Sequence, residues 1–255
     1  MKHQLLGKLS AALVVAAVTT CTVRHKPLSE KSFSVPYTST TAACGSEIDL
    51  NTAINKKLSS EDWAEADQAK KMLLNYSNES SVCRTEIINA LIQAMNKPNL
   101  SFVADRRDYF LWLNGSAIFG ELRAVEALDL LIDHLDLNDG AFSASMVHQP
   151  AFLGVKAIGV VAVPKLSRAL RQNANWNIRL AAALCLAEIG GADAMNALEQ
   201  ALGSESNPCV SHLIRIAIEI SNNQLKAKVD RSKDSDTDAQ IDLRRQLLMA
   251  FRCDN

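Results

Sequence analysis

The sequence predicts an all-α protein, a solenoid of stacked helical pairs that follows a flexible N-terminal tether. The composition is the first observation: 48% of the residues are hydrophobic but only 5% are aromatic, which favours helices over β-sandwiches. The second is self-similarity, because residues 117–135, 157–170 and 188–202 share one scheme. Each has an apolar residue, a glycine, a short connector and a second Leu-rich run. Such helical pairs cannot bury both faces alone, so they are expected to stack.

The glycines of this scheme predict where the first helix of each pair ends. Gly120, Gly159 and Gly190 each follow a segment with helical apolar spacing, and glycine is favoured just past a helix C-terminus. Pro164 is expected in the first turn of a following helix, where its missing N–H does no harm. A fourth unit is expected to begin near Asn207, so each unit is a helix, a tight turn and a second helix.

The stretch "NIRLAAALCLAEIGGADAMNALEQAL", residues 177–202, contains an Arg-x-x-Ala-Ala core and an Ile-Gly turn. This stretch resembles the HEAT repeat, most closely the short subclass named after phycobilisome lyases. Residues 150–170 and 108–135 resemble it less closely. The resemblance implies an α-solenoid, but it says little about activity, because the family includes enzymes, scaffolds and adaptors.

The remaining elements complete this prediction. The solenoid is expected over residues 59–222, with an irregular first pair whose second helix stops at Pro98. An insertion at 138–149 interrupts the repeats. The segment 223–240 is charged and poor in apolar residues, so it is expected to be a loop, and residues 241–255 are expected to form an amphipathic capping helix.

The N-terminus predicts export. Residues 1–21 combine two lysines with an apolar run at 11–18 that is too short for a permanent membrane helix, as in a cleaved signal. Two cleavage sites remain open: the small residues at 15–17 suit ordinary signal peptidase, and Cys21 ends a stretch like a bacterial lipobox. Residues 22–58 are rich in Ser, Thr and Pro and suit a tether. We therefore expect a periplasmic or cell-envelope protein, lipid-anchored or freely secreted.

The cysteines carry no Cys-x-x-Cys spacing. In an oxidising compartment Cys44 and Cys83 are the better disulfide pair, because the bond would fasten the tether to the first helical pair. Cys185 is expected to be a buried, inert thiol, too far from Cys209 for a disulfide. The pairing of Cys209 and Cys253 is left open.

Catalytic and cofactor motifs are absent from the sequence. It has no His-Glu dipeptide, no P-loop and no metal-ligand spacing, so we expect no enzyme activity, cofactor or metal. The formal charge of −1 argues against nucleic acid.

Two places are candidates for partner binding. The insertion offers small, polar and soft side chains: Ser143, Ser145, Met146, His148 and Gln149. The segment 102–115 concentrates the residue types of protein interfaces: Arg106, Arg107, Tyr109 and Trp112. In the alternative interpretation, Phe110 and Trp112 fill the gap between the first pair and the repeats.

Three functions fit these observations. The sequence favours a non-catalytic scaffold or adaptor that holds a protein or peptide on the solenoid surface and meets the membrane only through a lipid anchor. The second is a lyase-like chaperone that handles a chromophore or another small ligand, which the subclass name implies. The third is a structural envelope protein.

Overall fold

The computed structural model describes residues 48–97, 104–138 and 149–229. All of them belong to one compact unit, Thr40–Asn255. The described residues form helices and turns, and no strand occurs among them. The predicted export signal, the disulfide cysteine Cys44 and the predicted C-terminal helix lie outside the described residues.

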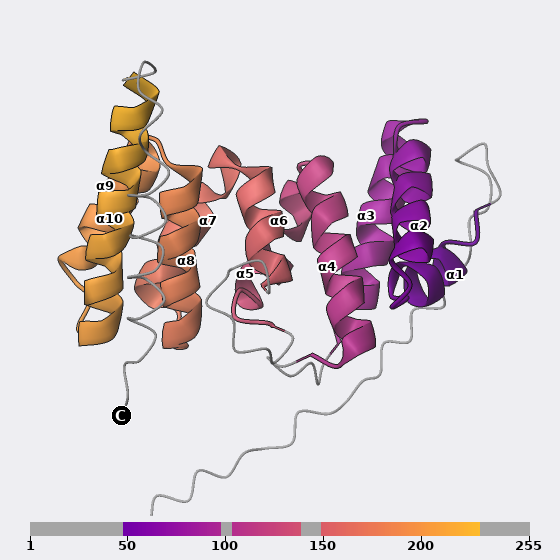
Figure 1. The fold of residues 1–255 in the computed structure, drawn as a ribbon, viewed down its shortest axis with the longest axis horizontal. Helices are drawn as coiled ribbons and strands as arrows, with labels where there is room; N and C mark the ends of the chain where they lie inside the picture. The colour runs from indigo at the N-terminus through magenta and orange to yellow at the C-terminus, as the bar shows by residue number, and fades with distance from the viewer. Residues whose placement is uncertain (1–47, 98–103, 139–148, 230–255) are drawn as a thin grey trace, which may run out of the picture. The chain divides into compact units, whose positions relative to one another are not determined.

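The first part of the unit contains a short helix α1 (Leu50–Thr52), a π-helix η1 (Ala53–Leu58) and the hairpin of α2 (Trp63–Ser77) and α3 (Ser81–Met95) (Figure 1). The predicted tether therefore extended too far, because residues 50–58 are helical. Three apolar side chains of η1 are buried against this hairpin: Ala53, Ile54 and Leu58.

The repeats follow as three further pairs and one long helix. These are α4 (Arg106–Glu121) with η2 (Val125–Ala127) and α5 (Leu128–Asp133), α6 (Pro150–Ile158) with η4 (Val160–Ala162) and α7 (Val163–Gln172), α8 (Trp176–Ile189) with α9 (Ala192–Leu202), and α10 (Pro208–Val229). The first helices stack in the order α4, α6, α8 and α10, and the second helices form another row (Figure 1). Since α10 reaches Val229, the predicted loop at 223–240 began too early.

Side-chain caps set where the helices begin. Asp62 accepts a hydrogen bond from the Ala64 N–H at 2.9 Å, and Asn175 accepts one from the Asn177 N–H at 2.9 Å. Ser80 and Asp105 cap α3 and α4 in the same way. Each cap satisfies one backbone donor that the first turn leaves unpaired, and replacing a cap by alanine typically costs about 1 kcal/mol.

The turns within the pairs confirm two of the three predicted glycines. Gly159 and Gly190 have φ angles of 85° and 68°, in the region that glycine adopts without strain. Gly120 was predicted wrongly, because it lies inside α4. The positive φ at the end of α4 belongs to Arg123, at 48°. Pro164 stands in the first turn of α7, as predicted.

One hydrophobic core runs from η1 to α10. Its largest fully buried side chains include Trp112 and Phe119 of α4. Within the described residues, no single helix has both the length and the apolar character to cross a membrane. The segments Pro150–Ile158 and Val160–Gln172 meet that test only together, across a bend of 106°.

Candidate functional site

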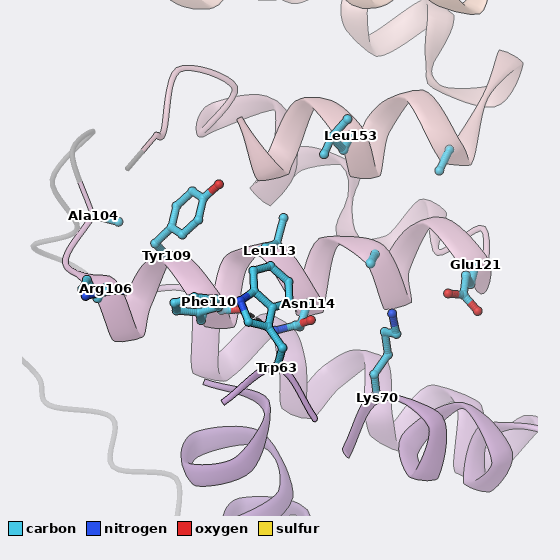
Figure 2. Close-up of a pocket in the computed structure, with 12 residues that line it drawn as sticks. Trp63, Lys70, Ala104, Arg106, Tyr109, Phe110, Leu113, Asn114, Glu121 and Leu153 are labelled. Carbon is cyan, nitrogen blue, oxygen red and sulfur yellow. Dashed lines mark hydrogen bonds between the residues drawn. The ribbon is translucent and has the colours of Figure 1, made fainter. Parts of the chain in front are cut away.

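A pocket lies between α2, α4 and α6, and we call it the groove (Figure 2). Its volume is about 1050 Å³, at the upper end of the range for small-molecule sites. It is lined by Trp63, Lys70, Ala104, Arg106, Tyr109, Phe110, Leu113, Asn114, Ala117, Glu121, Leu153 and Ala157.

Helix α4 forms the floor of the groove. Between Phe110 and Gly120, only Leu113 and Ala117 are partly exposed, and the other side chains are buried. Residues four positions apart lie on the same helix face, so these two side chains mark the line along which the groove runs. Arg106 and Glu121 stand on this face at the two ends of α4.

Helices α2 and α6 form the walls. Trp63 is the first residue of α2, directly after the cap Asp62, and its side chain is 63% exposed. The Trp63 ring packs edge-to-face on Phe110, with centroids 5.2 Å apart and an interplanar angle of 80°. Leu153 of α6 lies on the opposite wall (Figure 2), and Ala157, one turn further along α6, also lines the groove. The walls therefore present one large aromatic ring opposite smaller aliphatic groups.

Small residues bring the floor and the α6 wall close together. A Cβ atom added to Gly120 would lie 2.5 Å from the Cβ of Ala157. A Cβ atom added to Gly154 would lie 2.9 Å from the carbonyl oxygen of Ser116. Real Cβ atoms do not approach other atoms so closely, so the α4–α6 packing requires glycine at both positions.

A buried amide fixes the other side of the floor. Asn114 is buried, and its Nδ2 donates hydrogen bonds to the carbonyl oxygens of Leu58 at 3.0 Å and Phe110 at 2.9 Å. Leu58 ends η1, five residues before Trp63. Asn114 thereby ties to α4 the segment that leads into the Trp63 wall.

The charged residues of the groove are partly neutralised. Arg106 Nε lies 3.2 Å from the carboxylate of Glu61. Lys70 Nζ lies 3.5 Å from Asp67, but Asp67 is closer to Lys71, at 2.7 Å. The hydrogen bond from Lys71 holds the pKa of Asp67 below its usual value. Lys70 therefore shares a carboxylate that another lysine binds more closely.

Two of the predicted partner-binding residues, Arg106 and Tyr109, line the groove. Arg107 does not line it: its Nη2 donates a hydrogen bond to the carbonyl oxygen of Asn55, 3.2 Å away. The two predicted arginines therefore lie in different places: Arg106 lines the groove, and Arg107 is hydrogen-bonded to η1.

The assignment of Trp112 to partner binding needs correction. Its side chain is 1% exposed and its ring lies 4.8 Å from that of His134, so it belongs to the core between α4 and α5. Gln149 directly precedes α6 and is partly buried. The other predicted residues of the insertion lie outside the described residues: Ser143, Ser145, Met146 and His148.

Sequence reasoning missed Trp63, Lys70 and Leu153 as groove residues. One signal was available for Trp63, which follows the capping residue Asp62 and so falls in an exposed first turn. Nothing in the local sequence marks Lys70 or Leu153, because their place depends on how three helices pack.

The comparisons with known proteins concern the second half of the repeats. A family model described as HEAT repeats matches residues 153–219. Residues 153–219 are HEAT repeats. The match begins within α6 and ends within α10, and it does not distinguish the phycobilisome-lyase subclass. A search of the curated proteins found no match.

Cys185 lies in the middle of these HEAT repeats and is fully buried. Burial raises the pKa of its thiol well above the ordinary value, which disfavours the reactive thiolate. Cys185 is the free cysteine among the described residues, as expected of a packing residue. Cys83 is 1% exposed, and its pairing with Cys44 stays a prediction.

A second pocket, of about 290 Å³, lies between the second helices α5 and α7. It contains both signs of charge, and Lys165 Nζ lies 2.6 Å from Asp129 Oδ1. In the described part of the chain, no group of three or more His, Cys, Asp or Glu side chains is placed to hold a metal ion. The groove therefore remains the strongest candidate for a binding site.

Proposed function

We propose that this protein is a non-catalytic HEAT-repeat scaffold that binds a protein or peptide partner in the groove between α2, α4 and α6. The observation that carries the proposal is Trp63, 63% exposed at the rim of an open, mainly apolar groove. Tryptophan and arginine are enriched among the residues that dominate interface energies, and Arg106 lies in the same lining. HEAT repeats commonly serve protein–protein interaction, which supports a polypeptide partner.

The proposal also places the protein in the periplasm or cell envelope, held there by a lipid on Cys21 or freely secreted. Its support is the N-terminal sequence, with basic residues, a short apolar run and a cysteine. A disulfide at Cys83 belongs to this proposal. Cys185 is the free cysteine of the described residues, and Cys83 stands at the start of α3, where a bond could fasten the chain before the repeats.

A crosslinked pull-down from the native envelope tests the proposed function. Trp63→Ala removes the rim of the groove, and Trp176→Ala is the matched control. Both residues are the first of a helix and follow a side-chain cap, and Trp176 is 38% exposed outside the groove. We expect a partner that is enriched with the wild type and with the Trp176 variant. Its recovery with the Trp63 variant should be lower by about tenfold or more, as for a hot spot of 1.4 kcal/mol or more.

Two outcomes would contradict the proposal. Equal enrichment by both variants would remove the groove as the site, and a further variant lacking residues 138–149 would then test the insertion. A bound small molecule in the purified protein, with no partner, would favour the alternative in which the protein handles a chromophore or another small ligand.

A further inference from the structure

The backbone around the groove argues against an extended peptide. Leu113, Ala117 and Leu153 lie inside helices, where each N–H and C=O is bonded within its own helix. Ala104, before α4, donates its N–H to the carbonyl oxygen of Asn138 at 3.0 Å. A bound strand would therefore find few backbone partners and would leave its own polar groups unpaired. A helix satisfies its backbone internally, so it does not meet this penalty.

The groove also has the linear form that a helix requires. Its floor follows one face of α4 from Arg106 to Glu121. At a rise of 1.5 Å per residue, this distance is about 22 Å, or about four helical turns. The walls rise from other helices on both sides of this line, with Trp63 on α2 and Leu153 on α6 (Figure 2).

The side chains change in size along the groove. Large rings, Trp63, Tyr109 and Phe110, gather toward the Arg106 end (Figure 2). The lining also contains two small residues, Ala117, one turn before Glu121 on α4, and Ala157 of α6. Small residues leave depth, which a bulky aliphatic side chain of a partner would fill. The ring of Trp63 would in turn insert between turns of a bound helix, as ridges pack into grooves.

The two cations of the groove remain accessible to an acidic partner, although each already lies beside a carboxylate. The lining contains two cations, Lys70 and Arg106, against one carboxylate, Glu121. Lys70 shares Asp67 with Lys71, and Arg106 is 77% exposed beside Glu61. A carboxylate of the partner could therefore reach either cation without being buried.

We propose that the groove binds an amphipathic α-helix of about four turns, with an apolar stripe flanked by acidic residues. The apolar stripe lies along Leu113 and Ala117, and the acidic residues lie near Lys70 and Arg106. This inference rests on the proposed function, since it names the class of polypeptide that the same groove accepts.

Selection from two peptide display libraries by the full chain tests the inference. One library presents random residues on a fixed helical scaffold, and the other presents unconstrained peptides with a central proline. The helical library is expected to yield binders with large aliphatic residues at i, i+4 and i+7 and with Asp or Glu beside this stripe. We expect no binder that depends on the groove from the proline library.

Variants then assign the selected binders to the groove. Ala157→Glu places a longer, acidic side chain on the exposed α6 wall, and Ala192→Glu is the control on an exposed residue of α9. Trp63→Ala serves as a second groove variant should Ala157→Glu fail to fold. We expect the groove variants to weaken binding about tenfold or more, and a Lys70→Glu, Arg106→Glu double variant to do the same for acidic binders.

The outcomes separate the two proposals. Groove-dependent binders that come from the proline library, or that are basic, would overturn the helical, acidic partner and leave the proposed function intact. If neither library yields a binder that depends on the groove, and the envelope partner is insensitive to Trp63→Ala, both proposals fall.

Discussion

Replacing Gly154 by alanine tests whether the contact between α4 and α6 shapes the groove. The added Cβ would lie 2.9 Å from the carbonyl oxygen of Ser116 and 3.0 Å from its Cβ. One is a backbone atom and the other is the first side-chain atom of Ser116, so no rotamer change can move either of them away. The two helices must separate instead, and overpacking of this kind costs about 1–3 kcal/mol. Alanine also stabilises a helix by about 0.5–1 kcal/mol relative to glycine, which offsets part of this cost. We therefore expect a net destabilisation of about 1–2 kcal/mol.

The control is Gly203→Ala. Gly203 is exposed at the end of α9 with a φ of −68°, and the nearest atom to an added Cβ is 3.7 Å away. Alanine is free of strain there, so we expect no loss, or a gain of a few tenths of a kcal/mol from the restricted unfolded chain. Urea unfolding followed by circular dichroism measures both variants, with the midpoint shifting and the slope unchanged. If Gly154→Ala is as stable as Gly203→Ala, our reasoning about the α4–α6 contact is refuted.

Three further predictions concern buried polar groups. Ser116 Oγ is buried without a hydrogen-bond partner among the described residues. Ser116→Ala should therefore leave the free energy of unfolding unchanged or raise it by up to about 1 kcal/mol. If urea unfolding shows that the variant loses more than about 1 kcal/mol of stability, the hydroxyl has a hidden partner. Asn114→Ala removes both hydrogen bonds of the amide and should lower the free energy of unfolding by about 1–3 kcal/mol in the same assay. An unchanged midpoint would mean that these hydrogen bonds contribute nothing to stability. Burial raises the pKa of Glu205, but the hydrogen bonds from Arg179, at 2.9 and 3.2 Å, and from a backbone N–H outweigh this effect and hold the pKa below its ordinary 4.5. Stability from this pair is therefore present above about pH 4.5 and lost as the pH falls through the lower folded value. Between pH 7 and pH 3, the Tm measured by thermal unfolding should fall less for Glu205→Gln than for the wild type. An equal fall in Tm for both proteins would contradict this assignment.

The repeats could be predicted because their signals are local. The glycines at 159 and 190 mark turns that need a positive φ, and the Leu and Ala spacing of α8 and α9 marks two packed helices. Gly120 carries the same sequence signal for another reason. It allows α6 to approach α4, while Arg123 adopts the positive φ of the turn. Single-sequence patterns do not separate these two uses of glycine.

The groove could be predicted only in part. Helix α4 is apolar or small around most of its circumference from Phe110 to Gly120, so its sequence does not reveal which face is buried. For this reason Trp112 looked available for binding although it lies in the core. The exposed Trp63 comes from a different helix, and its place beside Phe110 depends on the packing of η1 and α2 against α4, which is a long-range contact.

Photocrosslinking in living cells tests whether the groove between α2, α4 and α6 binds a polypeptide. A photoreactive benzoylphenylalanine replaces Leu153 in the α6 wall, and in a control it replaces Trp176 outside the groove. If the groove is the binding site, we expect one crosslinked partner band from position 153, none from position 176, and loss of the band when Trp63→Ala is added. Crosslinks of equal intensity from both positions, or a band that persists with Trp63→Ala, would contradict it.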